Sequence, residues 1–201
     1  SNRRPDEVHS MAEVCLAELR TQHAEVIGLV ANRCPAPQLL AMRAALGYDL
    51  PAWAIPDDRV LMAPTVGALM EAVDGRLVAG DEELLSREAL DVLVGAMSVE
   101  HLVGKLSDGA VIITPGDRSD VLLGLLAAHA AEGYPSLAGI ILNGGFYPPP
   151  QVAKLVEGLG QRLPIIRSDY GTFRTASAAA SIRGRLSADS QRKVDTALAL
   201  F

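Results

Sequence analysis

Three short segments hold the residues best suited to bind a ligand: Gly95-Ala96-Met97, Gly116-Asp117-Arg118-Ser119-Asp120 and Asn143-Gly144-Gly145. Each segment follows an apolar run and precedes a stretch with helical periodicity. Glycine-rich turns let backbone N–H groups approach a ligand, and the N-terminus of a helix favours an anion. These patterns predict a ligand site or a tight interface, with the candidate residues Gly95, Met97, Asp117, Arg118, Asp120, Asn143, Gly144 and Gly145.

Asp117 and Arg118 could act together as a pair that reads a ligand. Arginine presents a planar fork that matches a phosphate or a carboxylate, and aspartate can accept a hydrogen bond from a ribose hydroxyl or a base amine. Alternatively, Asp117 or Ser119 caps the following helix, and Arg118 pairs with Asp120. The residues alone leave both interpretations open.

Thr172 and Thr175 begin a further helical stretch, directly after Asp169 and Tyr170. Their hydroxyl groups could contact the same ligand. Thr172 also sits where a helix N-cap is expected, and Asp169 is another candidate cap. Both threonines are therefore candidate site residues with a structural alternative.

Asn32 and Pro56 each follow a short apolar run in the first third of the chain. An asparagine at a strand end can read the edge of an adenine with two hydrogen bonds. However, the phosphate-binding sequence GxxxxGK[ST] occurs nowhere in the chain, so no lysine and N–H cradle for phosphates is expected. We therefore treat Asn32 and Pro56 as candidates for a vestigial base pocket, and favour a turn-capping role for Asn32.

No catalytic or metal-binding constellation stands out in the sequence. The four histidines lack metal-ligand spacing, the two cysteines form no CxxC pair, and there is no G-x-S-x-G motif. Cys15 lies on an apolar helical face and is expected in a core. We expect no catalytic residue, no metal and no cofactor, and therefore a binding or assembly module.

The composition is typical of a globular protein, and it argues against nucleic-acid binding and against a membrane-spanning segment. Of the 201 residues, 49% are hydrophobic, only 4% are aromatic, and the net charge is −6. An acidic surface repels a phosphate backbone, and no apolar run approaches the roughly 18 residues that span a bilayer. Two cysteines in a chain of this length favour a reduced, cytoplasmic protein.

Two successive alternations of helix and strand must position these residues. The first has expected helices at 6–20, 38–46 and 65–73 and strands at 26–31 and 52–55. Such alternation predicts right-handed crossovers and a parallel sheet, and the continuous apolar run 26–31 predicts a strand buried on both faces. Two strands are too few for a complete domain, so residues 3–75 are expected to form an incomplete α/β segment.

The second alternation is long enough to form a compact three-layer α/β domain over residues 80–201, with the boundary in 74–81. Its expected strands are 89–94, 110–114, 137–142 and 164–167, and its expected helices are 99–106, 120–132, 149–161, 172–181 and 187–200. In a parallel α/β sheet, ligands bind beyond the carboxyl ends of the strands. This fold would bring the three glycine-containing segments to one edge.

Three stretches of the second alternation resemble the DRTGG domain family: residues 94–121, 140–145 and 163–176. Their order and spacing match over residues 80–201, although Asn143 stands where the family usually has threonine. Residues 26–33 and 54–69 are similar to the back half of the dethiobiotin-synthetase-like, P-loop-type domain of long-form bacterial phosphate acetyltransferases.

The resemblance implies a fragment that starts after the phosphate-binding loop and ends before the acetyltransferase domain. The parent enzyme would interconvert acetyl-CoA and phosphate with acetyl phosphate and CoA. This chain would be its non-catalytic regulatory and oligomerisation region, with another copy of itself, the catalytic domain and a regulatory metabolite or nucleotide as partners. One alternative is a stand-alone nucleotide sensor, and another is a dethiobiotin-type ATP-dependent ligase, which the missing phosphate loop disfavours.

Overall fold

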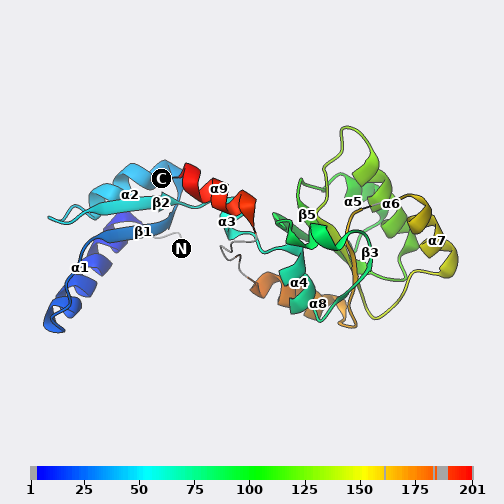
Figure 1. Cartoon of the computed structure of the whole chain (residues 1–201), viewed down its shortest axis with the longest axis horizontal. Coiled ribbons are helices and arrows are strands. Elements are labelled where there is room, and N and C mark those ends of the chain that lie inside the picture. The colour runs from blue at the N-terminus through cyan, green and yellow to red at the C-terminus, as the bar shows by residue number, and fades with distance from the viewer. Residues whose placement is uncertain (1–3, 161, 183, 185–189, 201) are drawn as a thin grey trace. The chain divides into compact units, whose positions relative to one another are not determined.

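The computed structural model describes residues 4–160, 162–182, 184 and 190–200. The chain forms two compact units, Val60–Asp195 and a smaller one made of Ser1–Arg59 with Thr196–Phe201 (Figure 1). The division between them falls before the segment 74–81 that the sequence favours as a boundary. Helix α4 (Val66–Ala72) belongs to the larger unit because Val66 and Leu69 are buried in a core that also contains Ile166. The domain assignment of 3–75 and 80–201 stays a prediction.

The smaller unit is built on a two-stranded parallel sheet. Its elements are α1 (Pro5–Thr21), β1 (Leu29–Cys34), the 3-10 helix η1 (Ala36–Gln38), α2 (Leu39–Ala45) and β2 (Ala52–Pro56). β1 and β2 pair in parallel, with Leu29 opposite Ala52. The expected parallel pairing is therefore confirmed, and β1 begins three residues later than its apolar run suggests.

The expectation that β1 is buried on both faces is wrong. Ile27, just before the strand, is 84% exposed, and Val30 within it is 58% exposed. Trp53, which lies opposite Val30 in β2, is 49% exposed. Helices α1 and α2 pack on the other face of the sheet, where Met42 and Leu46 are buried. Cys15, expected in a core, is exposed as well.

The larger unit contains a five-stranded sheet. After α4, its elements are β3 (Arg76–Ala79), the 3-10 helix η2 (Glu82–Ser86), β4 (Asp91–Val94), α5 (Val99–Val103), β5 (Ala110–Pro115), α6 (Ser119–Ala130), β6 (Gly139–Asn143), α7 (Pro150–Gly158), β7 (Ile165–Arg167) and α8 (Thr172–Ser181). The division between the units falls within α3 (Arg59–Met62), after its first residue, and within α9 (Gln191–Ala199), after Asp195. The strand order is β3-β7-β6-β5-β4, with β4 to β7 parallel and β3 antiparallel to β7. The predicted parallel-dominated α/β fold is thus confirmed. The expected start of the last helix, residues 187–189, lies outside the described residues.

Two cores cover the two faces of this sheet. The first holds Leu102 of α5, Leu125 of α6 and Val156 of α7, and the second holds side chains of α4 and α8 (Figure 1). Successive residues of β5 alternate between them, with Ile112 in the first core and Ile113 in the second. Burial on both faces makes the sheet a rigid middle layer, so the positions of its strand ends are well defined. None of the helices in the described part of the chain has the length and hydropathy needed to cross a membrane.

Candidate functional site

The carboxyl ends of β4, β5 and β6 bring the three predicted segments to one edge of the larger sheet. The strands are parallel and adjacent, so Gly95, Gly116 and Asn143 follow neighbouring strand ends. The backbone N–H of Gly116 donates to the carbonyl of Asn143 at 3.0 Å, which places the second and third segments in direct contact. The spatial gathering expected from the sequence is therefore present.

The glycine N–H groups at this edge form hydrogen bonds within the unit. The N–H groups of Gly95, Gly116, Gly144 and Gly145 donate to the carbonyl oxygens of Ile113, Asn143, Tyr170 and Ser168, at 2.8, 3.0, 2.8 and 3.0 Å. Gly144 and Gly145 have φ values of +84° and +79°, a backbone region that favours glycine. These two glycines are thus required by a turn that joins the end of β6 to the loop after β7.

Asn143 is buried and its side chain joins three elements. In the orientation that satisfies both ends of the amide, the oxygen accepts from the N–H and the hydroxyl of Thr172, each at 2.8 Å. The nitrogen donates to the carbonyl of Thr114 at 2.9 Å. Asn143 therefore ties β6 to β5 and to the first residue of α8.

Arg118 forms a bidentate ion pair with Asp120. Its Nε lies 2.9 Å from Oδ1 of Asp120, and its Nη2 lies 2.8 Å from Oδ2. The hydrogen bonds from Arg118 lower the pKa of Asp120 to about 2. The geometry is that of the intramolecular alternative, in which Arg118 binds Asp120, while Asp117 is exposed beside it. The carbonyl of Met97 lies 3.5 Å from the same guanidinium.

The N-caps of α6 and α8 are not the residues expected from the sequence, which are Asp117 or Ser119 for α6 and Thr172 or Asp169 for α8. The N-cap of α6 is Arg118 and that of α8 is Gly171, because these residues adopt the non-helical backbone and the next residue is already helical. Ser119 and Thr172 are therefore first helical residues. Thr175 is buried and donates to the carbonyl of Gly171 at 3.1 Å, so its hydroxyl is used inside α8.

The structure adds a group of exposed aromatic and arginine side chains that the sequence analysis missed. Phe146 and Tyr147 follow Asn143-Gly144-Gly145, and Phe173 stands near the start of α8; they are 52%, 63% and 87% exposed. The guanidinium of Arg167 lies 4.3 Å from the ring centre of Tyr147, and that of Arg174 lies 3.6 Å from the ring centre of Tyr170. We refer to Phe146, Tyr147, Arg167, Tyr170, Phe173 and Arg174 as the aromatic edge.

Arg167 anchors the aromatic edge to the glycine turn. Its Nε and Nη2 donate to the carbonyl of Gly145 at 3.1 and 2.6 Å, and Nη2 also binds Oδ1 of Asp169 at 2.6 Å. In the sequence, the aromatic edge is indicated only by the position of Phe146 directly after Gly145. Because exposed aromatics form no periodic pattern, the edge is visible only once the strands are assembled.

A small apolar cavity opens beside Tyr147, on the side of α7. Its volume is about 250 Å³, and its lining includes Val78, Tyr147, Pro148 and Ile165. The charged residue in the lining is Glu157. An acidic side chain in an apolar cavity repels a phosphate, so this cavity suits an uncharged group better than a nucleotide.

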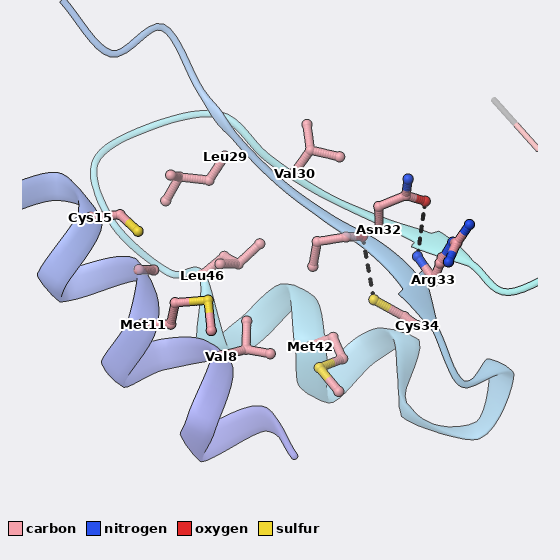
Figure 2. Close-up of a pocket in the computed structure, with 12 residues that line it drawn as sticks. Val8, Met11, Cys15, Leu29, Val30, Asn32, Arg33, Cys34, Met42 and Leu46 are labelled. Atoms are coloured by element: carbon pink, nitrogen blue, oxygen red, sulfur yellow. Dashed lines mark hydrogen bonds between the residues drawn. The ribbon is translucent and has the colours of Figure 1, made fainter. Parts of the chain in front are cut away.

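The smaller unit has an apolar hollow of about 390 Å³ between α1, β1 and α2, whose lining includes Asn32 but not Pro56 (Figure 2). Asn32 is exposed, and its side chain points away from the helices (Figure 2). Its Oδ1 accepts from the N–H of Arg33 at 2.9 Å, and Arg33 has a φ of +62°. Asn32 thus supports the turn, which is the role that the sequence analysis favours for this residue. Pro56 pairs opposite Cys34 at the end of the sheet.

In the part of the chain that the structure describes, no three side chains of histidine, cysteine, aspartate or glutamate lie together as they would around a metal ion.

Comparison with known proteins places this geometry in a family. The sequence model of the DRTGG domain matches residues 68–182, which include every element of the larger sheet. The phosphate acetyltransferase of Nitratidesulfovibrio vulgaris is 32% identical over 153 residues, or 76% of this chain and 22% of that protein. That of Synechocystis sp. is 29% identical over 195 residues, or 94% of this chain and 28% of that protein. The chain thus spans less than a third of the length of these relatives.

Among solved structures, the chain is similar to the CBS and DRTGG domains of the regulatory region of Clostridium perfringens pyrophosphatase, complexed with the activator diadenosine tetraphosphate. The TM-score is 0.49 and the sequence identity is 16%, over 91% of this chain and 74% of the other.

Proposed function

Because this chain belongs to the DRTGG domain family, we propose that it is a non-catalytic regulatory and assembly region of a cytoplasmic phosphate acetyltransferase. The similarity to proteins of that name over most of this chain supports the parent activity, which would exchange acetyl groups between acetyl-CoA and phosphate. In the complete protein, the region would contact the catalytic domain and other copies of itself.

One observation supports assembly over catalysis at the carboxyl edge. The N–H groups of Gly95, Gly116, Gly144 and Gly145 and the amide of Asn143 are bonded within the unit, while large aromatic side chains at the same edge are exposed. A catalytic or anion-binding site needs free, convergent polar groups. An assembly surface needs exposed aromatic and arginine side chains on a rigid support.

Sedimentation velocity over a wide range of protein concentration, together with an acetyl-transfer assay, tests this proposal. We expect the chain to self-associate and to transfer no acetyl group from acetyl-CoA to phosphate. A strictly monomeric chain would contradict the assembly role, and measurable acetyl transfer would contradict the non-catalytic role.

A second candidate function is nucleotide sensing, which the two arginine–aromatic pairs favour. Aromatic rings and guanidinium planes can stack on a nucleobase. A ligand present at 100 times its dissociation constant adds about 2.7 kcal/mol to folding stability, so binding should appear as a shift in melting temperature. We would test ATP, ADP, AMP, NADH, acetyl-CoA and pyruvate. A shift with any nucleotide supports sensing, and an unchanged melting temperature with all of them excludes it for this chain.

A further inference from the structure

We propose that the aromatic edge is a two-fold interface between two copies of this chain. The inference rests on the proposed assembly role and names the surface that would perform it. It depends on three features of the edge: its exposed rings, the stacking of arginines on two of its tyrosines, and the presence of both signs of charge.

The exposure of the rings is concentrated on one edge of the sheet. The chain has three phenylalanines, four tyrosines and one tryptophan, so large aromatic surfaces are scarce. Phe146, Tyr147 and Phe173, each at least half exposed, all follow the adjacent strands β6 and β7. Single exposed apolar residues are common on protein surfaces, whereas a group of them marks an interaction site.

The rings of Tyr147 and Tyr170 are held in place before any partner arrives. Arg167 and Arg174 stack on them at 4.3 and 3.6 Å, and Arg167 is itself fixed by the carbonyl of Gly145. An ordered side chain loses less conformational freedom on association than a mobile one. The aromatic edge is therefore prepared to bind a rigid surface.

The charges at the edge favour a second copy over a phosphate-bearing ligand. Charges of both signs lie at this end of the sheet, where Asp117 and Glu100 are close to the Arg118–Asp120 pair and Asp169 is close to Arg167. Arg118 and Arg167 already bind Asp120 and Asp169. A site for phosphate needs an excess of free positive charge. A two-fold interface instead presents the same patch on both sides, so it must carry both signs to be self-complementary.

The net charge of the whole chain also favours this edge as the surface where two copies meet. Two chains of charge −6 repel each other over most of their surfaces. The edge, where Arg167 and Arg118 are paired with acidic side chains and Arg174 stands near them, is a region where two copies can meet with less of that repulsion. The aromatic side chains then supply the apolar contact.

Sedimentation velocity of the whole chain and of single variants tests this interface. We expect Phe173→Asp and Tyr147→Asp to weaken self-association at least tenfold, because each places a carboxylate against the partner copy. Phe173→Ala should weaken it as well, without adding charge. Circular dichroism and thermal melting would show that each variant is folded.

Tyr134→Asp is the matched control. Tyr134 is 51% exposed and lies in the turn between α6 and β6, at the amino end of that strand. It should leave self-association unchanged. If the wild-type chain associates and the Phe173 and Tyr147 variants associate equally tightly, the interface lies elsewhere and the assembly role stands. If the wild-type chain is monomeric at every concentration, both the interface and the assembly role are wrong.

Discussion

At the residue scale, Asn143 is a candidate ligand-binding residue whose side chain has a structural role. Its amide bonds the backbone of β5 on one side and the first residue of α8 on the other. A threonine at this position would have one hydroxyl in place of an amide and could retain only part of these bonds. The reach of the asparagine side chain therefore gives this residue a structural role.

We therefore expect Asn143→Ala to lower the free energy of unfolding by about 2–3 kcal/mol, since it leaves buried backbone groups unsatisfied. Asn143→Thr should cost less, because its hydroxyl can still bond one of the two sides. Urea unfolding at neutral pH measures both. Wild-type stability in Asn143→Ala would show that the amide does not connect these elements.

The ion pair of Arg118 and Asp120 has a consequence at low pH. The pKa of Asp120 is lowered to about 2 in the folded chain, below the ordinary value of 3.8. The pair therefore contributes stability above the ordinary value, and that contribution is lost as the pH falls through 2. We expect NMR titration of the Asp120 carboxyl to show a midpoint near 2, and a return toward the ordinary value in Arg118→Ala. An unchanged midpoint in the variant would mean that another group holds the carboxylate charged.

Arg118→Ala should also keep the fold and nearly all of its thermal stability, because a surface ion pair contributes little. A loss of several degrees in melting temperature without ligand would show that Arg118 has a larger structural role.

At the element scale, buried strands are easier to predict than edge strands and helix starts. The apolar runs of β5 and β6 identify these strands because both of their faces are buried. β3 has four residues, alternates exposed and half-buried side chains, and forms only by pairing with β7, about ninety positions later in the chain. No local pattern indicates such a strand. The helix caps were missed because the backbone of Arg118 and Gly171, rather than a capping side chain, sets where α6 and α8 begin.

The candidate site, too, could be predicted only in part from the sequence. The meeting of Gly95, Gly116 and Asn143 at one edge follows from strand order and could be predicted. The bonding of the Gly144 and Gly145 N–H groups to the carbonyls of Tyr170 and Ser168 depends on the path of the loop after β7, which the sequence does not reveal.

The attachment of α9 to the larger unit gives a prediction at this scale. Lys193 is buried, and its Nζ donates to the carbonyl of Ala63 at 2.5 Å. Ser190 donates to Oε1 of the buried Glu88 at 2.7 Å, and Nη1 of Arg192 lies 3.5 Å from Oε2 of Glu88. The beginning of α9 is thus held by polar bonds to buried groups. We expect Lys193→Ala to destabilise the larger unit by about 1–3 kcal/mol, measured by urea unfolding, because it leaves the Ala63 carbonyl unsatisfied.

The same lysine should make stability depend on alkaline pH. Burial lowers the pKa of Lys193 below its ordinary value of 10.5. Between the two values the unfolded chain binds more protons, so stability rises with pH in that window and is lost as the pH falls through the folded pKa. The stability difference between wild type and Lys193→Met should therefore grow as the pH is raised toward 10.5. A constant difference would mean that the amine stays charged in the folded chain.

At the scale of the whole molecule, the two units differ in how their sheets are supported. β5 and β6 lie between two helical layers and are buried on both faces, whereas β1 and β2 form a sheet of two strands with exposed Val30 and Trp53 on one face. A two-stranded sheet has little independent stability, and local opening is easiest where few apolar contacts must be broken. We therefore expect the backbone amides of β1 and β2 to exchange with solvent at least about 100-fold faster than those of β5 and β6, as one sub-global opening event. Hydrogen–deuterium exchange followed by mass spectrometry measures the exchange rates of all four strands in one sample.

The variant Asn143→Ala provides an internal control. It should speed exchange in β5 and β6 and leave β1 and β2 unchanged, because the bonds of Asn143 lie within the larger unit. Equal exchange protection of all four strands would show that the chain opens as a single cooperative unit. It would also show that the exposed face of the smaller sheet does not lower the stability of that sheet.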